Sequence, residues 1–135
     1  MKTVYLLRGV SGAGKSTLAQ SLMLAHSDVQ VTHIEADMFF YGVDGKYNFD
    51  HTKLSNAHQW CFDRFTDCCE YPDTSVVICS NTFTTKKEIQ RYIDKAKEHN
   101  CKLVVLTVEK CHDSENVHDV PSNVLLAQRK RFELL

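Results

Sequence analysis

The amino-acid sequence predicts a three-layer α/β domain built on a mainly parallel sheet of four to five strands. Its short apolar runs are continuous rather than alternating, as in strands buried on both faces of a parallel sheet. Helical patterns separate these runs along the chain, which favours right-handed crossovers between parallel strands. With 135 residues, 43% of them hydrophobic, the chain can bury one core, so we expect residues 1–135 to form a single domain.

Strands and helices are expected to alternate from the start of the chain. Four apolar runs predict strands, at residues 4–7, 31–34, 76–79 and 103–108. Residues 15–25 have an amphipathic helical pattern, with an apolar face formed by Leu18, Ala19 and Leu22. A longer pattern at helical spacing predicts a second helix, whose inward residues are Leu54, Ala57, Cys61, Phe65 and Cys68. Both helices are expected to pack on the sheet.

Capping signals mark the remaining two helices. Thr85 followed by Glu88 is the capping-box pattern of a helix start. The residues that this third helix should turn inward are Ile89, Ile93 and Ala96. The helix is expected to stop near Asn100. Pro121 suits the first turn of a final helix that ends around Glu133.

The segment Gly9-Val-Ser-Gly-Ala-Gly14-Lys15-Ser16 matches the pattern G-x-x-x-x-G-K-[ST] between a predicted strand and a predicted helix. In such a loop, backbone N–H groups and the helix N-terminus face phosphate oxygens. We expect Lys15 to reach the β- and γ-phosphates of ATP, and the Ser16 hydroxyl to bind Mg²⁺. The sequence therefore predicts a P-loop NTPase or kinase fold rather than an ordinary glycine-rich turn. The residues expected to hold the nucleotide are Gly9, Ser11, Gly12, Ala13, Gly14, Lys15, Ser16 and Thr17.

Two polar segments, residues 38–50 and 109–121, interrupt the alternation of strands and helices. In the first, Asp44-Gly45 is a turn signal between aromatic residues, which predicts a small hairpin or a loop over the site. The second is rich in histidine and acidic residues. Polar excursions beside a phosphate site commonly carry substrate contacts or close over it, so a small lid is expected.

The ends of the predicted strands distinguish among the proteins that use this loop. Motors and switches place an acidic residue at the end of an apolar strand to hold Mg²⁺. Here residues 76–79 are followed by Ser80-Asn81, and the run 103–108 is followed by Glu109. The sequence also has no Asn-Lys-x-Asp stretch of the kind that reads guanine. A GTPase is therefore poorly supported, and a chain of this length leaves little room for the helical lid domain of an oligomeric motor.

Asp37 lies at the carboxyl end of the second predicted strand, in His33-Ile-Glu-Ala-Asp37. Strand ends of a parallel sheet converge on the ligand. A carboxylate there suits a general base, which accepts the proton of an acceptor hydroxyl during phosphoryl transfer. The alternative is that Asp37 only caps the following segment. Glu35 would lie on the same strand face but deeper, and it is the weaker candidate.

Further short motifs follow the phosphate loop in order. They are Leu7-Arg8-Gly9, Glu35-Ala36-Asp37-Met-Phe-Phe40, Asp44-Gly45-Lys-Tyr47-x-Phe49, Ala57-His58-x-Trp60-Cys61, Asn81-Thr82 with Glu88, and Asn116-Val-His118-x-Val120-Pro121. With the loop, they give nearly the whole chain a resemblance to the polynucleotide 5′-kinase-like branch of the P-loop kinases. This branch includes the phage polynucleotide kinase domain and small stand-alone AAA-family relatives.

The resemblance implies transfer of the γ-phosphate of ATP, with Mg²⁺, to a hydroxyl of a nucleic-acid 5′-end or a nucleoside-like small molecule. It implies that Asp37 activates this hydroxyl and that Asn81 and Thr82 line the acceptor side. Two positions depart from the family pattern: Glu115 replaces a lid arginine, and Phe40 replaces an arginine of the phage enzyme. A plain P-loop NTPase, or a nucleotide-dependent binding module without kinase activity, therefore stays open.

Several side chains have two interpretations. Three cations could replace the missing lid charge: Lys110, Arg129 and Arg131. The two arginines also fit the solvated face of the last helix. His58 and Trp60 are expected to be packing residues of the second helix. The following aromatic residues could stack a base or form the core of a short flap: Phe39, Phe40, Tyr41, Tyr47 and Phe49.

Composition excludes several classes of protein. The formal net charge is −1, from 16 Lys and Arg against 17 Asp and Glu, so no broad electrostatic surface for nucleic acid is expected. The longest apolar run is too short to span a bilayer and no signal-type segment is seen, which predicts a soluble, cytoplasmic protein without a membrane partner. The six cysteines have no zinc-ribbon spacing, so neither a disulfide scaffold nor a zinc site at Cys111 and His112 is favoured.

Overall fold

The structure, a computed structural model, describes residues 1–109 and 120–135. Its sheet has four strands, all parallel, in the order β2-β3-β1-β4. Their bounds are β1 (Thr3–Arg8), β2 (Val31–Ile34), β3 (Val76–Asn81) and β4 (Lys102–Thr107). In this register Arg8 lies opposite Asn81 on one side and Thr107 on the other. The carboxyl ends of the three longer strands therefore meet at one edge of the sheet, as the sequence predicts.

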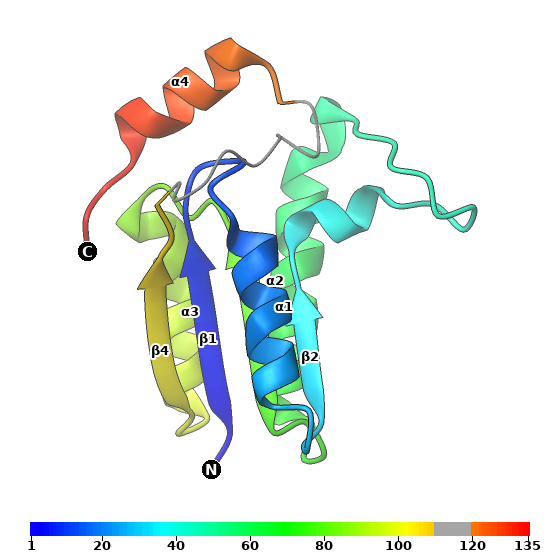
Figure 1. Cartoon of the computed structure of the whole chain (residues 1–135), viewed down its shortest axis with the longest axis vertical. Coiled ribbons are helices and arrows are strands. Elements are labelled where there is room, and N and C mark those ends of the chain that lie inside the picture. Colours follow the sequence, from blue (N-terminus) through cyan, green and yellow to red (C-terminus); the bar gives the residue numbers. More distant parts are fainter. Residues whose placement is uncertain (110–119) are drawn as a thin grey trace.

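Helices cover both faces of the sheet, which confirms the three-layer fold (Figure 1). Helix α1 (Lys15–Ala25) packs on one face, where Leu7, Ala19 and Ile78 form the core. The other face is covered by α2 (Leu54–Glu70) and α3 (Lys86–Glu98). The larger core cluster lies there, and its members include Val4, Leu6, Cys61, Phe65, Val77 and Ile89. Among the described residues, no helix is long and apolar enough to cross a membrane.

A fourth helix, α4 (Ser122–Arg131), lies across the carboxyl ends of the strands (Figure 1). It begins at Ser122, which confirms the predicted final helix, although Pro121 is its N-cap and not a residue of its first turn. The helix ends at Arg131, two residues before the expected end. From Phe132 on, the chain runs down toward the loop between β3 and α3, where Glu133 N donates to Thr84 O at 2.6 Å.

The inward faces of α2 and α3 differ in detail from the prediction. The fully packed residues of α2 are Ala57, Cys61, Phe65 and Cys69, which follow one another at a spacing of four. Cys68 is only partly buried, and Leu54 is 42% exposed because the helix begins there, at the edge of the domain. On α3 the buried position is Tyr92 rather than Ile93. Tyr92 and Ile93 follow the buried Ile89 by three and four residues, and both spacings lie on the same helix face, so the tertiary contacts decide which of the two is buried.

The polar segment after β2 forms a short flap. The helix η1 (Ala36–Phe40) is followed by an antiparallel bridge between Tyr41 and Tyr47, and then by η2 (His51–Lys53). Gly45, at φ +75°, accommodates the turn, as the Asp-Gly signal predicts. Phe40 is 5% exposed, and its ring centroid lies 5.0 Å from that of Phe49. The flap therefore has a small aromatic core of its own.

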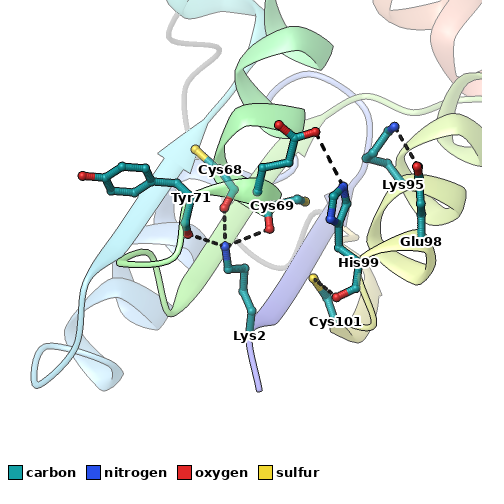
Figure 2. Close-up of polar contacts among 9 residues, drawn as sticks. Lys2, Cys68, Cys69, Tyr71, Lys95, Glu98, His99 and Cys101 are labelled. Carbon is teal, nitrogen blue, oxygen red and sulfur yellow. Dashed lines mark hydrogen bonds and ion pairs between the residues drawn. The ribbon is translucent and has the colours of Figure 1, made fainter.

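At the amino ends of the strands, Lys2 caps the C-terminal end of α2 (Figure 2). Its ammonium group donates to three backbone carbonyls, those of Cys68 at 2.6 Å, Cys69 at 2.9 Å and Tyr71 at 2.7 Å. A cation at this position satisfies carbonyl groups that the helix end leaves unpaired and interacts favourably with the helix dipole. Lys2 thus fastens the start of β1 to α2, far from the phosphate loop.

Arg8, the last residue of β1, is fully buried. Its guanidinium group donates to the carbonyl of Phe83 at 2.8 and 3.1 Å and to the carbonyl of Glu133, and it lies 4.2 Å from the centroid of the Phe132 ring. Phe83 has a left-handed backbone with φ +44°, which is a strained conformation for a bulky residue. Arg8 therefore holds both this turn and the C-terminal tail in place.

Candidate active site

The loop between β1 and α1 has the backbone of a phosphate site. Gly12 and Gly14 have φ angles of +79° and +106°, which favour glycine. The first backbone bond within α1 runs from Leu18 N to Gly14 O at 3.0 Å. An α-helix leaves the N–H groups of its first turn without intrahelical acceptors, and here they belong to residues 15–17. Since Ser16 and Thr17 are exposed, these N–H groups and hydroxyls can meet an anion from solvent.

Gly9 has a packing reason in addition to its place in the motif. A Cβ atom at this position would lie 2.6 Å from the carbonyl oxygen of Val108. The residues that follow β4 therefore pass directly against the start of the loop. Ala13 is buried and its N–H donates to Val10 O at 3.1 Å, which closes the loop on itself.

Lys15 points into the loop, where its ammonium group donates to Gly9 O at 2.7 Å and Val10 O at 2.9 Å. Burial lowers the pKa of Lys15 to about 8, against the opposing attraction of Glu35 and, less strongly, Asp37. The structure thus brings together the predicted phosphate-binding lysine and the two predicted carboxylates. A phosphate oxygen would add a further negative charge that favours the protonated form of this partly buried lysine.

Asp37 lies beyond the strand rather than on it. Strand β2 ends at Ile34, and Asp37 is the second residue of η1. Where the chain leaves the strand, the Asn81 side chain accepts a hydrogen bond from Ala36 N at 2.8 Å. The phenol of Tyr47 donates to Asp37 Oδ1 at 3.2 Å and so positions this carboxylate. This contact was not predicted from the sequence. Only the turn signal at Asp44-Gly45 indicated that the chain would fold back.

The two predicted acceptor residues, Asn81 and Thr82, form hydrogen bonds to other segments of the protein. Besides Ala36 N, Asn81 contacts the thiol of Cys61, to which its amide donates at 3.4 Å. The backbone oxygen of Thr82 accepts from Gly9 N at 3.2 Å. Both residues therefore link the end of β3 to the neighbouring segments, one to the start of η1 and the other to the phosphate loop. Contact of either with an acceptor stays a prediction.

Helix α4 contributes a contact that the sequence gave no sign of. Gln128 is 7% exposed, and its side-chain oxygen accepts a hydrogen bond from Ser11 N at 2.9 Å. Next to this contact a cavity of about 290 Å³ opens on the β4 side of the loop. Its lining residues are Gly9, Val10, Thr107, Val108, Glu109, Arg129, Phe132 and Leu134. The site thus has a cavity on the β4 side and carboxylates on the β2 side.

Some of the remaining predicted residues lie in the part of the chain that the structure describes, and others lie outside it. Trp60 packs against the core and its ring centroid lies 6.0 Å from that of Phe39, as expected of a packing residue. Arg129 and Arg131 are both exposed, as expected for the solvated face of the last helix, and Arg131 also donates to Thr84 Oγ1 at 3.1 Å. Six positions considered above lie in residues 110–119, outside the part of the chain that the structure describes: Lys110, Cys111, His112, Glu115, Asn116 and His118.

Comparison with known families decides the family of this chain. The model of the AAA_33 family, described as an AAA domain, matches residues 4–135. The chain belongs to this family. Over 101 residues it is 32% identical to human NEDD4-binding protein 2, covering 75% of this chain but only 6% of that much longer protein.

Solved structures with the same fold include kinases. Kti12 from Chaetomium thermophilum, determined in complex with ADP-AlF3, superposes with a TM-score of 0.65 at 14% identity, covering 97% of this chain and 80% of Kti12. A gluconokinase from Sinorhizobium meliloti 1021 superposes with a TM-score of 0.60 at 19% identity, covering 98% of this chain and 75% of that enzyme. At these identities the likeness shows the fold, which is that of the P-loop kinases.

Proposed function

We propose that this AAA_33 domain is a kinase that transfers the γ-phosphate of ATP to a hydroxyl group. The observation that carries the proposal is the placement of Asp37, which accepts a hydrogen bond from Tyr47 on the β2 side of the loop and, together with the stronger attraction of Glu35, favours the charged form of the partly buried Lys15. A carboxylate opposite the phosphate-binding lysine is what phosphoryl transfer to a hydroxyl needs and what nucleotide binding alone does not.

The residues of the loop fit ATP and Mg²⁺. Lys15 exchanges its bonds to Gly9 O and Val10 O for bonds to the β- and γ-phosphates, which also face the N–H groups at the start of α1. The exposed hydroxyl of Ser16 is the ligand for Mg²⁺, which supplies neutralising charge to the phosphates when bound. The cavity on the β4 side, beside Phe132, accommodates the base.

In the transfer step Asp37 accepts the proton of the acceptor hydroxyl. The acceptor oxygen attacks the γ-phosphorus, its proton passes to Asp37, and the bond between the γ-phosphorus and the bridging oxygen breaks to leave ADP. Lys15 stabilises the charge that develops on the phosphate oxygens. The Tyr47 hydroxyl donates to Oδ1 of the Asp37 carboxylate and so orients it.

A groove on the flap is our candidate for the acceptor site. This groove, at the base of the flap, is lined by Phe39, Phe40, Tyr41, Gly42, Asn48, Phe49, Asp50, His51 and Lys53. Exposed aromatic rings such as those of Tyr41 and Phe49 can stack a nucleobase, while Lys53 can supply positive charge for a phosphate. These features favour a nucleic-acid 5′-end or a nucleoside-like molecule as the acceptor.

An acceptor screen with γ-labelled ATP and Mg²⁺ tests the proposal. It offers single-stranded DNA and RNA with 5′-hydroxyl ends, nucleosides, nucleotides and buffer alone. We expect label on a hydroxyl acceptor, no transfer by Lys15→Ala, and a loss of roughly 10²- to 10⁴-fold for Asp37→Asn at unchanged ATP affinity. Label released only to water would indicate an NTPase, and ATP binding without turnover would indicate a binding module. Full activity of Asp37→Asn would overturn the role of this residue.

A further inference from the structure

Strand β3 ends beside the phosphate loop without the acidic residue that P-loop proteins commonly place there for Mg²⁺. The residues at this end are Ser80 and Asn81, and the amide of Asn81 is engaged by Ala36 and Cys61. We propose that Glu35, reaching over from the end of β2, supplies the missing carboxylate for Mg²⁺. The inference rests on the proposed binding of ATP and Mg²⁺, and it assigns to Glu35 a role separate from that of Asp37.

The geometry places the Glu35 carboxylate at the end of β3. Its Oε2 atom lies 3.4 Å from the hydroxyl oxygen of Ser80. That hydroxyl is also 2.7 Å from His33 Nε2, and Ser80 is 1% exposed. Strands β2 and β3 are adjacent and parallel, so a residue just past the end of β2 can occupy the position that a strand-end acid on β3 would otherwise fill.

The contacts of Ser80 orient Glu35. His33 Nε2 lies within hydrogen-bonding distance of the Ser80 hydroxyl, at 2.7 Å. With its proton on Nε2, the ring donates to Ser80 Oγ, and the hydroxyl proton of Ser80 is then directed to Glu35. Hydrogen-bonded neighbours of this kind fix a carboxylate in the direction that a metal ion requires.

The two carboxylates are held differently. Asp37 is bound to the flap through Tyr47, whereas Glu35 is bound to the sheet through Ser80. We therefore assign the sheet-bound carboxylate to the phosphate-bound cation and the flap-bound carboxylate to the acceptor.

Serine, histidine and glutamate also occur together in hydrolases, but that interpretation fails here. A nucleophilic serine has to be reached by its substrate, and Ser80 lies in the middle layer of the domain, almost without exposure. Ser80 therefore acts on Glu35 as a positioning residue.

Metal binding measured without an acceptor tests the inference. Mn²⁺, a spectroscopic substitute for Mg²⁺, is titrated into the protein–ADP complex and free Mn²⁺ is followed by electron paramagnetic resonance. Glu35→Gln should weaken Mn²⁺ binding by about 10- to 100-fold, the range for groups that support a metal site. ADP binding in the presence of a chelator should be unchanged. Asp37→Asn is the matched control and should change Mn²⁺ affinity by less than about twofold, because it serves the acceptor.

A second substitution moves the carboxylate back to the strand. Glu35→Gln combined with Ser80→Asp should recover most of the lost Mn²⁺ affinity, which a merely structural defect would not allow. Unchanged affinity in Glu35→Gln, or a loss only in Asp37→Asn, overturns the inference. If circular dichroism shows Glu35→Gln unfolded, Ser80→Ala keeps the carboxylate and removes its donor, and undiminished Mn²⁺ binding then overturns the proposal equally. Because no acceptor is used, a failed acceptor screen would reject the kinase proposal and leave this result standing.

Discussion

The phenol of Tyr47 and the carboxylate of Asp37 are joined by a hydrogen bond of 3.2 Å that connects the flap to the proposed general base. Burial and the negative charge of Asp37 raise the pKa of Tyr47, so the phenol keeps its proton and remains a donor. Tyr47→Phe should therefore lower kcat by about tenfold or more, the equivalent of one hydrogen bond to a charged group. ATP affinity should not change. The exposed Tyr41, mutated to Phe, is the control, and equal losses in both variants would contradict the specific role of Tyr47.

Nucleotide binding should take up a proton at Lys15. In the free protein burial lowers the pKa of this lysine to about 8, whereas bound phosphates favour the charged form and raise its pKa again. Well below pH 8 the lysine is already charged, so no uptake is expected. Above pH 8 binding must protonate it, and ATP affinity should fall as the pH rises.

Calorimetry in buffers of different ionisation enthalpy measures this uptake. The observed binding enthalpy of the wild type should depend on the buffer at pH 9. At pH 7 Lys15 should contribute no buffer dependence. Lys15→Arg, which remains charged, should show no buffer dependence at pH 9. The same proton uptake in both proteins would assign it to another group.

A negative charge at position 128, beside the phosphate loop, should weaken ATP binding. Its side-chain oxygen accepts from Ser11 N at 2.9 Å, and Gln128→Glu places a carboxylate there with little change of shape. We expect ATP binding to weaken by about tenfold or more, because like charges in a partly buried site repel. Gln128→Ala, which removes the contact without adding charge, should have a much smaller effect. Equal affinities for the two variants would show that α4 moves away when ATP binds.

Lys2 should contribute to stability and not to turnover. Its three hydrogen bonds to the carbonyls at the end of α2 (Figure 2) should make Lys2→Ala less stable by about 1–2 kcal/mol. Lys95 is the matched control, since its ion pair with Glu98 lies at the surface, where such pairs contribute little. Urea denaturation compares the two variants. A loss of phosphate transfer in a folded Lys2→Ala variant would contradict this assignment.

Local sequence signals predict most of the fold. The run 31–34 and the helix 15–25 have the same bounds in the sequence pattern and in the structure, because burial periodicity and β-branched content are local properties. The capping box at Thr85 is formed in part. Thr85 accepts from Glu88 N at 3.3 Å, but the Glu88 carboxylate binds Thr84 N at 2.7 Å instead of returning to Thr85.

The sequence by itself determined the three-layer fold and the motif of the phosphate loop, since the glycines, Lys15 and Ser16 of that motif lie in one continuous segment. The tertiary structure alone decided which side chains meet around that loop. Glu35 and Ser80 are 45 residues apart and Ser11 and Gln128 are 117 apart. Such pairs depend on which strands are neighbours and on where the chain turns after β2. Periodicity reports which face of an element is buried, but it does not report which distant residue lies against that face.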